Sequence, residues 1–156
     1  MRIPTFLLGA VLVVGLAACG KTSGHQDAHR DAPAATEKGV HVEIAQSSLG
    51  PILTDQNGRT LYAFINDKAG TSSCTGECIA SWPALVSHQA VTAGPGADKA
   101  LLSQTTRAEG TAQATYGDWP LYYYVGDVGP GDVDGQGVDD KWFVIGADGK
   151  LIKGNA

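Results

Sequence analysis

The amino-acid sequence predicts a mainly β fold: a small antiparallel-sheet or barrel-like domain made of two diverged repeats, with one or two short helical turns. Three observations predict it. Short runs of β-branched and aromatic residues are separated by glycine-containing turns, as in antiparallel hairpins. The chain holds 21 glycines and a single methionine, a composition that favours turns and short strands. The pattern Leu-Tyr-x-aromatic-x-x-Asp occurs twice, sixty positions apart, at 61–67 and 121–127.

Residues 1–18 are interpreted as an export signal. Arg2 gives a positive start, and the apolar run that follows is too short to span the ~30 Å hydrocarbon layer comfortably. The signal ends in Leu-Ala-Ala before Cys19, which resembles the bacterial lipobox, so Cys19 is expected to carry the lipid after cleavage. Because burial of acyl chains contributes ~0.8 kcal/mol per methylene, several chains give a stable anchor. The alternative is an ordinary secretory signal in which Cys19 is incidental.

Residues 19–38 are expected to be the acylated cysteine and a flexible tether, because they contain no apolar period. The membrane is then the expected partner, through the lipid anchor. The expected location is the cell envelope: Gly20 after Cys19 favours the outer membrane if the cell has one, and otherwise the outer face of the cell membrane. The formal net charge is −5 and no Lys/Arg cluster occurs, so no nucleic-acid partner is expected.

Residues 39–156 are the expected β-rich domain, with repeats at about 49–83 and 104–145. Val40, Val42 and Ile44 alternate with polar residues, the period of a half-buried strand. Three hairpins are predicted, and they turn at 55–58, 109–110 and 148–149. In the first, Asn57-Gly58 is a strong hairpin signal because both residues tolerate positive φ.

Residues 121–125 are apolar on both faces, which predicts a central strand. Single helical turns are expected at 78–82, where Pro83 stops the helix, and at 97–103. The run 90–96 is interpreted as a loop. The sequence contains no long amphipathic helix that could bind a partner helix or lie on a membrane surface.

The repeated motif supplies Tyr62, Phe64 and Asp67 in the first repeat, and Tyr122, Tyr124 and Asp127 in the second. Residues two apart on a strand share a face, so each aromatic pair is expected to stack side by side. Each Asp then lies just past the strand end, where it can accept backbone N–H groups. The functional alternative is an aromatic platform with an acidic rim, suited to a sugar or an organic cation.

These motifs resemble a family of small bacterial lipoproteins with a Tyr-x-(Phe/Trp/Tyr)-x-x-Asp motif, described as secreted repeats of unknown function. The resemblance covers about residues 40–156. It includes the motif residues, the Trp-Pro pairs at 82–83 and 119–120, the segment 107–113, the Gly-Gln-Gly at 135–137 and Trp142. Glu109 stands where an Asp is commoner in the family. The resemblance implies an exported lipoprotein but no defined activity.

Cys74 and Cys78 enclose three residues. No His follows Cys78 as in a haem-attachment motif, and no second Cys/His pair completes a zinc site. In an oxidising compartment the expected state is a disulfide. A loop this small contributes less than the ~3 kcal/mol of a fifteen-residue loop, so local shaping is its expected role. The alternative is a redox-active dithiol.

Residues 127–140 form an acidic, glycine-rich run. Asp132, Asp134, Gln136 and Asp140 fall at positions 1, 3, 5 and 9 of a calcium loop, but position 12 is Phe143, where a bidentate Glu is expected. No cofactor is therefore expected, with Ca²⁺ as the one candidate ion and a solvated loop as the alternative reading.

No activating motif for catalysis is present, so the chain is not expected to be an enzyme. The leading hypothesis is a lipid-anchored envelope lipoprotein that acts as a non-enzymatic binding or envelope-structural module. One alternative is a redox or electron-transfer accessory protein that uses Cys74 and Cys78 or a bound cofactor. The other is a calcium-dependent adhesion or carbohydrate-binding module. The sequence identifies no protein or small-molecule partner.

Overall fold

The structure is a computed structural model that describes residues 39–154. The predicted signal at 1–18, the lipidation site Cys19 and the tether to residue 38 lie outside the described residues. Residues 39–154 belong to one compact unit with eight short strands, one α-helix and two 3-10 turns. The prediction of a mainly β domain with short helical turns is confirmed.

The strands are β1 (His41–Ser47), β2 (Gly50–Asp55), β3 (Tyr62–Phe64), β4 (Thr92–Ala93), β5 (Leu102–Thr106), β6 (Ala112–Tyr116), β7 (Trp119–Pro120) and β8 (Trp142–Val144). The helix α1 spans Glu77–Ser81, and the 3-10 turns are η1 (Lys99–Leu101) and η2 (Val138–Asp140). α1 and η1 lie where helical turns were predicted. β4 lies in the run 90–96 that was interpreted as a loop.

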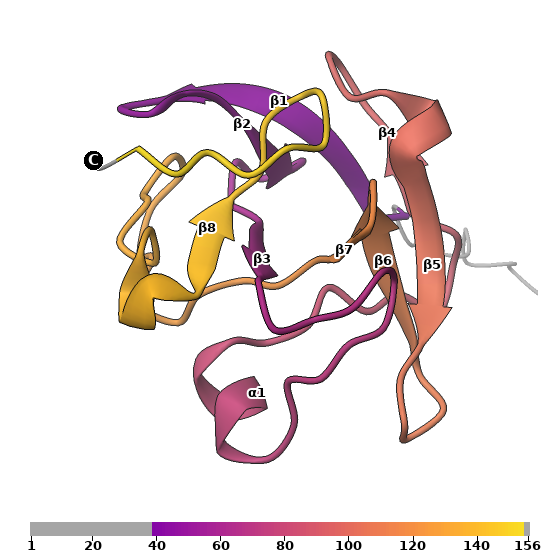
Figure 1. Cartoon of the computed structure of the whole chain (residues 1–156). Coiled ribbons are helices and arrows are strands. Elements are labelled where there is room, and N and C mark those ends of the chain that lie inside the picture. Colours follow the sequence, from indigo (N-terminus) through magenta and orange to yellow (C-terminus); the bar gives the residue numbers. More distant parts are fainter. Residues whose placement is uncertain (1–38, 155–156) are drawn as a thin grey trace, which may run out of the picture. The chain divides into compact units, whose positions relative to one another are not determined.

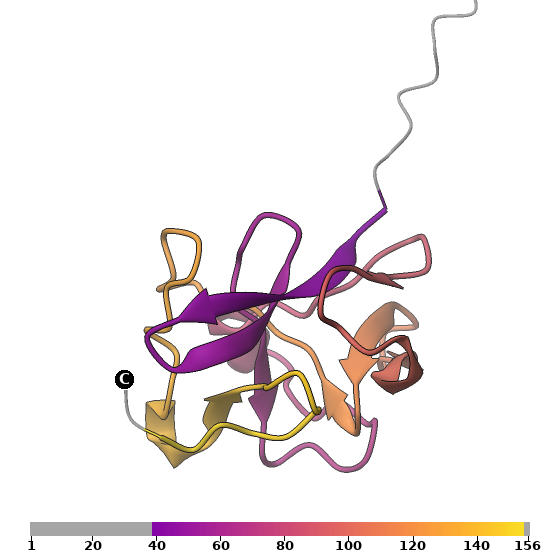
Figure 2. The same cartoon turned by 90° about the horizontal axis from the view of Figure 1, so that it is seen from above.

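In the described residues the strands form three small sheets, with the orders β2-β1-β4, β3-β8 and β5-β6-β7. Every pairing is antiparallel except that of β1 with β4, which is parallel. The sheets stay open and do not close into a barrel. Figures 1 and 2 show the β1–β2 hairpin along one side of the unit and the β5–β6 hairpin along another.

β1 follows the predicted alternation. Val42 is fully buried, and Val40 and Ile44 pack against the same hydrophobic cluster. His41 and Glu43 alternate with them and lie 3.5 Å apart, from His41 Nε2 to a Glu43 carboxylate oxygen. The period-two pattern therefore reports the burial of this strand correctly.

The hairpin prediction at 109–110 is confirmed: β5 and β6 pair antiparallel up to Thr106↔Ala112, and Gly110 takes a φ of 88° in the turn. The turn at 148–149 is also present. There the Gly146 N–H donates to the Lys150 carbonyl at 2.9 Å, and Ile145 bridges Leu151. Both turns place a glycine where φ is positive, which other residues rarely adopt.

The hairpin predicted at 55–58 is present but short. Thr54 bridges Thr60, the Leu61 N–H donates to the Leu53 carbonyl at 3.0 Å, and the Asp55 N–H donates to the Arg59 carbonyl at 2.9 Å. The longer ladder of β2 is the one with β1. In this turn Gly58 alone takes positive φ, and the Asp55 carboxylate accepts the N–H groups of Asn57 at 2.8 Å and Arg59 at 3.0 Å.

Residues 121–125 are central, as predicted, but they do not form a regular strand. Tyr122 bridges Tyr62 on one side and Ala84 on the other. The neighbouring segment contains Pro83, which has no N–H to donate, although its carbonyl accepts the Tyr123 N–H at 2.8 Å. A proline in the partner limits the ladder to isolated bridges.

The buried side chains form two clusters. One lies beneath the two long hairpins and is largely aliphatic, with Val42, Leu53, Leu61, Leu85, Leu121 and Ile145 among its members. The other is largely aromatic and contains Tyr62, Trp82, Tyr122, Trp142 and Cys74. The motif tyrosines therefore belong to the aromatic cluster, which holds the candidate site.

Candidate functional site

The two copies of the motif meet at the centre of the domain. The Tyr62 N–H donates to the Tyr122 carbonyl at 2.8 Å, and the Tyr122 N–H donates to the Tyr62 carbonyl at 3.0 Å. The pair is reciprocal: each repeat donates to and accepts from the other at the same position of the motif. Ile65 donates to the Lys141 carbonyl, and its counterpart Val125 donates to the Ser81 carbonyl. Each motif segment thus pairs with a segment near the end of the other repeat.

Each motif tyrosine is hydrogen-bonded to the motif aspartate of the other repeat. The Tyr62 hydroxyl donates to Asp127 Oδ2 at 2.9 Å, and the Tyr122 hydroxyl donates to Asp67 Oδ2 at 2.7 Å. Both tyrosine side chains are fully buried. We call these contacts the two tyrosine–aspartate pairs. Each satisfies a buried hydroxyl with a charged acceptor, which is the stronger class of hydrogen bond.

Each aspartate also accepts a backbone N–H, as predicted, but from farther along the chain than a local turn would place it. Asp67 Oδ1 accepts the Ser73 N–H at 2.7 Å and the Ser73 hydroxyl at 2.6 Å. Asp127 Oδ1 accepts the Asp134 N–H at 3.0 Å. The carboxylates therefore hold the loops that follow the motif as well as the opposite tyrosine.

The ionisation of these groups reflects their burial. Desolvation, followed by the hydrogen bond and charge of Asp67, raises the pKa of Tyr122 to about 12, although the Ser72 hydroxyl opposes the shift. Desolvation and the charge of Asp127 raise the pKa of Tyr62 still further. Burial also raises the pKa of Asp127, against the lowering effect of the Tyr62 hydroxyl. Both tyrosines are neutral donors at ordinary pH.

Four aromatic rings, one from each of four segments, form a continuous stack. Tyr124 stacks on Trp82 with centroids 4.3 Å apart, and Trp82 stacks on Trp142 at 3.8 Å with an interplanar angle of 2°. Phe64 stacks on Trp142 at 4.4 Å. We call these four residues the aromatic stack. Trp82 and Trp142 are buried, whereas Phe64 and Tyr124, at the two ends, are partly exposed.

The motif tyrosines meet this stack edge-on. Tyr62 contacts Trp82 at a centroid distance of 5.4 Å, and Tyr122 contacts Trp142 at 5.2 Å. Edge-to-face and offset contacts of this kind add about 0.5–1.5 kcal/mol each beyond area burial. The sequence-based expectation that Tyr62 stacks on Phe64 and Tyr122 on Tyr124 is wrong, because the rings interleave between repeats.

Sequence reasoning also missed the counterpart of Trp82. Trp119 stands in the second Trp-Pro pair, but it lies in β7 and packs against the aliphatic cluster. The counterpart is Trp142, at the start of β8. The signal was present in the sequence: Trp82 follows Tyr62, and Trp142 follows Tyr122, by the same twenty positions.

Gly135 allows the loop after the second motif to approach this cluster. A Cβ at this position would lie 2.8 Å from atoms of both Trp82 and Tyr62, closer than packed atoms allow. The Gly135 N–H donates to the Tyr62 hydroxyl at 3.2 Å. The glycine is therefore required by close approach, and it gives Tyr62 a second partner.

A buried arginine joins the first motif loop to the β5–β6 hairpin. Arg107 is 6% exposed. Its guanidinium donates to the Ser72 hydroxyl at 2.7 Å, to Gln113 Oε1 at 2.8 Å, to the Cys74 carbonyl at 2.9 Å and to Glu109. Gln113 Nε2 in turn donates to the Leu121 carbonyl at 2.8 Å. Arg107 and Gln113 therefore connect the β5–β6 hairpin to the loop after the first motif and to the start of the second motif.

The predicted disulfide between Cys74 and Cys78 is present. Cys74 is buried in the aromatic cluster and Cys78 is partly exposed. The disulfide directly follows Ser72 and Ser73, which contact Tyr122 and Asp67, and the Cys74 carbonyl accepts from Arg107.

Two of the four residues named in the calcium hypothesis, Asp132 and Gln136, are hydrogen-bonded within the domain. Asp132 Oδ2 accepts the N–H groups of Val128 and Gly129. Gln136 Nε2 donates to the carbonyls of Ile152 and Gly154, and Gln136 Oε1 accepts the Val144 N–H. Asp134 and Asp140 are exposed. Within residues 39–154, no three His, Cys, Asp or Glu side chains come together to hold a metal ion.

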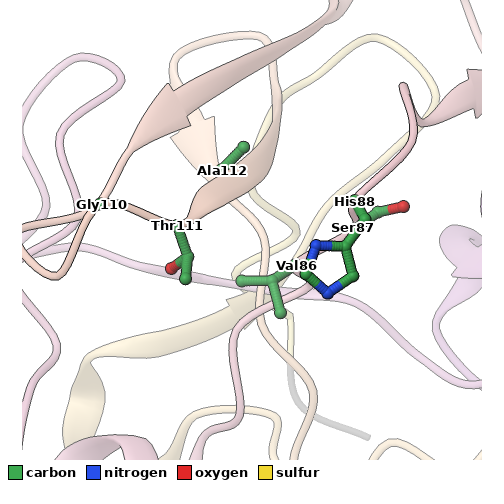
Figure 3. A pocket seen from close by; sticks show the side chains of 6 residues that line it. All are labelled: Val86, Ser87, His88, Gly110, Thr111 and Ala112. Atoms are coloured by element: carbon green, nitrogen blue, oxygen red, sulfur yellow. The ribbon is translucent and has the colours of Figure 1, made fainter.

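A surface pocket of about 430 Å³ lies away from the motif. It is lined by Val86, Ser87, His88, Gly110, Thr111 and Ala112. Figure 3 shows the Val86 side chain between Thr111 and the His88 ring. His88 is the one ionisable side chain of this lining. The Ser87 hydroxyl accepts the Gln89 N–H at 3.2 Å, and the Thr111 hydroxyl donates to Glu109 Oε1 at 3.3 Å.

The comparisons with known proteins agree with the repeated architecture. A family model described as a secreted repeat of unknown function matches the chain twice, at residues 43–86 and 103–145, which together cover more than half of it. Searches of curated proteins and of solved structures gave no match. Residues 39–154 contain no helix long and apolar enough to cross a membrane. The family's description indicates an extracellular or envelope location. The chain belongs to this family of secreted repeats of unknown function.

Proposed function

We propose that this protein is a non-enzymatic structural module of the cell envelope, held at the membrane by lipid on Cys19. One observation carries the structural part of the proposal: the signature residues of both repeats are used to hold the repeats together. Tyr62 and Tyr122 are fully buried, and each is bonded to an aspartate of the opposite repeat. A motif whose polar atoms are satisfied internally serves the fold before it serves a ligand.

The anchoring part of the proposal is supported by the sequence and the family. The apolar leader ends at Cys19 in a lipobox-like pattern, and the family is a secreted one. Gly20 favours the outer membrane if the cell has one. A domain with its own core, at the end of a polar tether, can then be displayed at some distance from the lipid surface.

Anchoring is tested with Cys19→Ser in the full chain. We expect the wild-type protein to fractionate with membranes and to incorporate labelled palmitate, and the variant to lose both properties. Thr22→Ala is the matched control, because it changes the same segment and keeps the cysteine. A variant that stays membrane-bound and labelled at another residue would disprove lipidation at Cys19.

The non-enzymatic role is tested by complementation of the envelope defects of a deletion strain, such as detergent sensitivity. We expect Tyr62→Phe/Tyr122→Phe to complement poorly, in proportion to its loss of folded protein, and His88→Ala to complement fully. His88 lies in the surface pocket and is exposed. If His88→Ala folds and remains anchored but fails to complement, a chemical role for the pocket replaces the structural proposal.

A further inference from the structure

The aromatic cluster has a second property besides packing: it is a continuous path of oxidisable rings. From Tyr124 the path runs to Trp82 at 4.3 Å and on to Trp142 at 3.8 Å. Tyr122 lies 5.2 Å from Trp142, and Tyr62 lies 5.4 Å from Trp82. Indole and phenol are the side-chain rings that lose an electron most readily, and contacts this short allow an electron vacancy to move rapidly between them.

Both tyrosines at the inner end of this path have a proton acceptor in place. A phenol that loses an electron becomes a very strong acid and must release its hydroxyl proton. The Tyr122 hydroxyl already donates to Asp67 Oδ2 at 2.7 Å, and the Tyr62 hydroxyl to Asp127 Oδ2 at 2.9 Å. Burial raises the pKa of Asp127, which makes its carboxylate a better base for this proton.

The path also has one oxidisable end near solvent. Tyr124 is partly exposed, whereas Trp82 is 5% and Trp142 is 2% exposed. Phe64 closes the other end of the aromatic stack, and its ring is much harder to oxidise. Tyr124 is therefore the ring of this path that an oxidant in solution can reach. The residue left oxidised would be one of the buried tyrosines, Tyr62 or Tyr122.

We propose that the aromatic stack and the two tyrosine–aspartate pairs form a relay that gives one electron to one-electron oxidants, such as organic peroxyl radicals, at the Tyr124 surface. The oxidant gains one electron through Tyr124 and Trp82, from Tyr62 directly or from Tyr122 by way of Trp142. It takes a proton from water, so that a peroxyl radical becomes a hydroperoxide. Tyr122 or Tyr62 loses that electron, and its hydroxyl proton passes to Asp67 or Asp127. The product is a neutral tyrosyl radical beside a protonated carboxyl group. This activity goes beyond the structural role proposed above.

The test uses the detergent-solubilised full chain and a photogenerated tris-bipyridyl ruthenium(III) oxidant. Tyrosyl radical is measured by transient absorption and by electron paramagnetic resonance after freeze-quenching. We expect the radical in the wild type, and at least about a tenfold lower rate of its formation in Asp67→Asn/Asp127→Asn, equivalent to about 1.4 kcal/mol of activation free energy. Tyr62→Phe/Tyr122→Phe should lose the buried radical.

Tyr123→Phe is the matched control. Tyr123 also donates its hydroxyl to an aspartate, Asp55 Oδ2 at 3.0 Å, but its ring takes no part in the aromatic stack. The Tyr123→Phe substitution should leave the yield of tyrosyl radical and its rate of formation unchanged. Near-UV circular dichroism identifies the variants that fold. A radical yield in Tyr62→Phe/Tyr122→Phe equal to that of the wild type, or a loss in Tyr123→Phe as large, overturns the relay.

A second measurement needs no substitution. Because the proposed step moves the hydroxyl proton with the electron, the wild-type protein should form the radical more slowly in deuterated water. A rate that does not change between light and heavy water overturns the role of the aspartates. A radical confined to exposed tyrosines in the wild type overturns the path itself.

Discussion

At the scale of single residues, the buried hydroxyls of Tyr62 and Tyr122 explain why the motif contains tyrosine followed by aspartate. A phenylalanine would fill the same space but would leave the carboxylate oxygen of the opposite repeat without a donor. Leaving a buried acceptor unpaired costs more than the net gain of an ordinary hydrogen bond. The motif is therefore a matched pair of donor and acceptor, split between two repeats.

Tyr122→Phe should lower the free energy of unfolding by about 1–3 kcal/mol, because Asp67 Oδ2 and the Ser72 hydroxyl lose a buried partner. Tyr123→Phe is the control. Its hydroxyl also contacts an aspartate, but the side chain is partly exposed, so the free energy of unfolding should fall by only about 1 kcal/mol. Urea unfolding monitored by tryptophan fluorescence measures both. Equal decreases in the free energy of unfolding for the two variants would contradict the special role of the two tyrosine–aspartate pairs.

The raised pKa of Tyr122 has a consequence for stability at high pH. Its pKa is 10.0 ordinarily and about 12 in the folded protein, chiefly through desolvation. Between these values the unfolded chain releases the proton while the folded chain keeps it, so stability must fall as pH rises through this window. We expect the urea midpoint to decrease from about pH 10 upward, and to decrease less steeply in Tyr122→Phe. Parallel slopes would contradict this assignment.

At the scale of elements, the two loops that follow the motifs are equivalent in position but held differently. The first, residues 68–81, contains the disulfide and α1 and is clamped by Arg107. The second, residues 128–141, is held by Asp127, Asp132 and Gln136 through backbone groups. The loop after the first motif thus contains a disulfide, where the loop after the second motif is held by side-chain hydrogen bonds alone.

Replacing both cysteines, as Cys74→Ser/Cys78→Ser, should destabilise the domain by less than about 3 kcal/mol, because the closed loop is short. The effect should be local: amide exchange should accelerate in residues 68–81, whereas β1 and β2 should stay protected. Hydrogen exchange measured by mass spectrometry tests this. Uniform acceleration across the domain would show that the disulfide supports the whole fold.

Much of this element-level structure could be predicted, since hairpin chemistry is local. The Glu109-Gly110 turn and the alternation around Val42 were read correctly from a few residues each. The pairing of β3 with β8 could not be predicted, because it joins segments that lie far apart in the chain. For the same reason the crossed tyrosine–aspartate pairs, and the burial of Arg107, were not predicted.

At the scale of the whole molecule, each repeat is completed by the other. β8, at the end of the second repeat, pairs with β3 of the first, while Ala84, near the end of the first repeat, bridges Tyr122 of the second. The aromatic stack alternates accordingly, with Trp82 between Tyr124 and Trp142. Neither repeat can bury its own aromatic residues, so the duplicated sequence makes one folding unit and not two.

This interlocking predicts that the halves fold only together. Fragments 39–98 and 99–154 should each lack near-UV circular dichroism, because β3 without β8, and Tyr122 without Ala84, have no partner to pair with. Mixed in equal amounts, they should form a one-to-one complex by size-exclusion chromatography and recover the native spectrum. The same mixture with Trp82→Ala should recover it poorly, since this removes the centre of the aromatic stack. A single fragment that unfolds cooperatively alone would show that the repeats are independent.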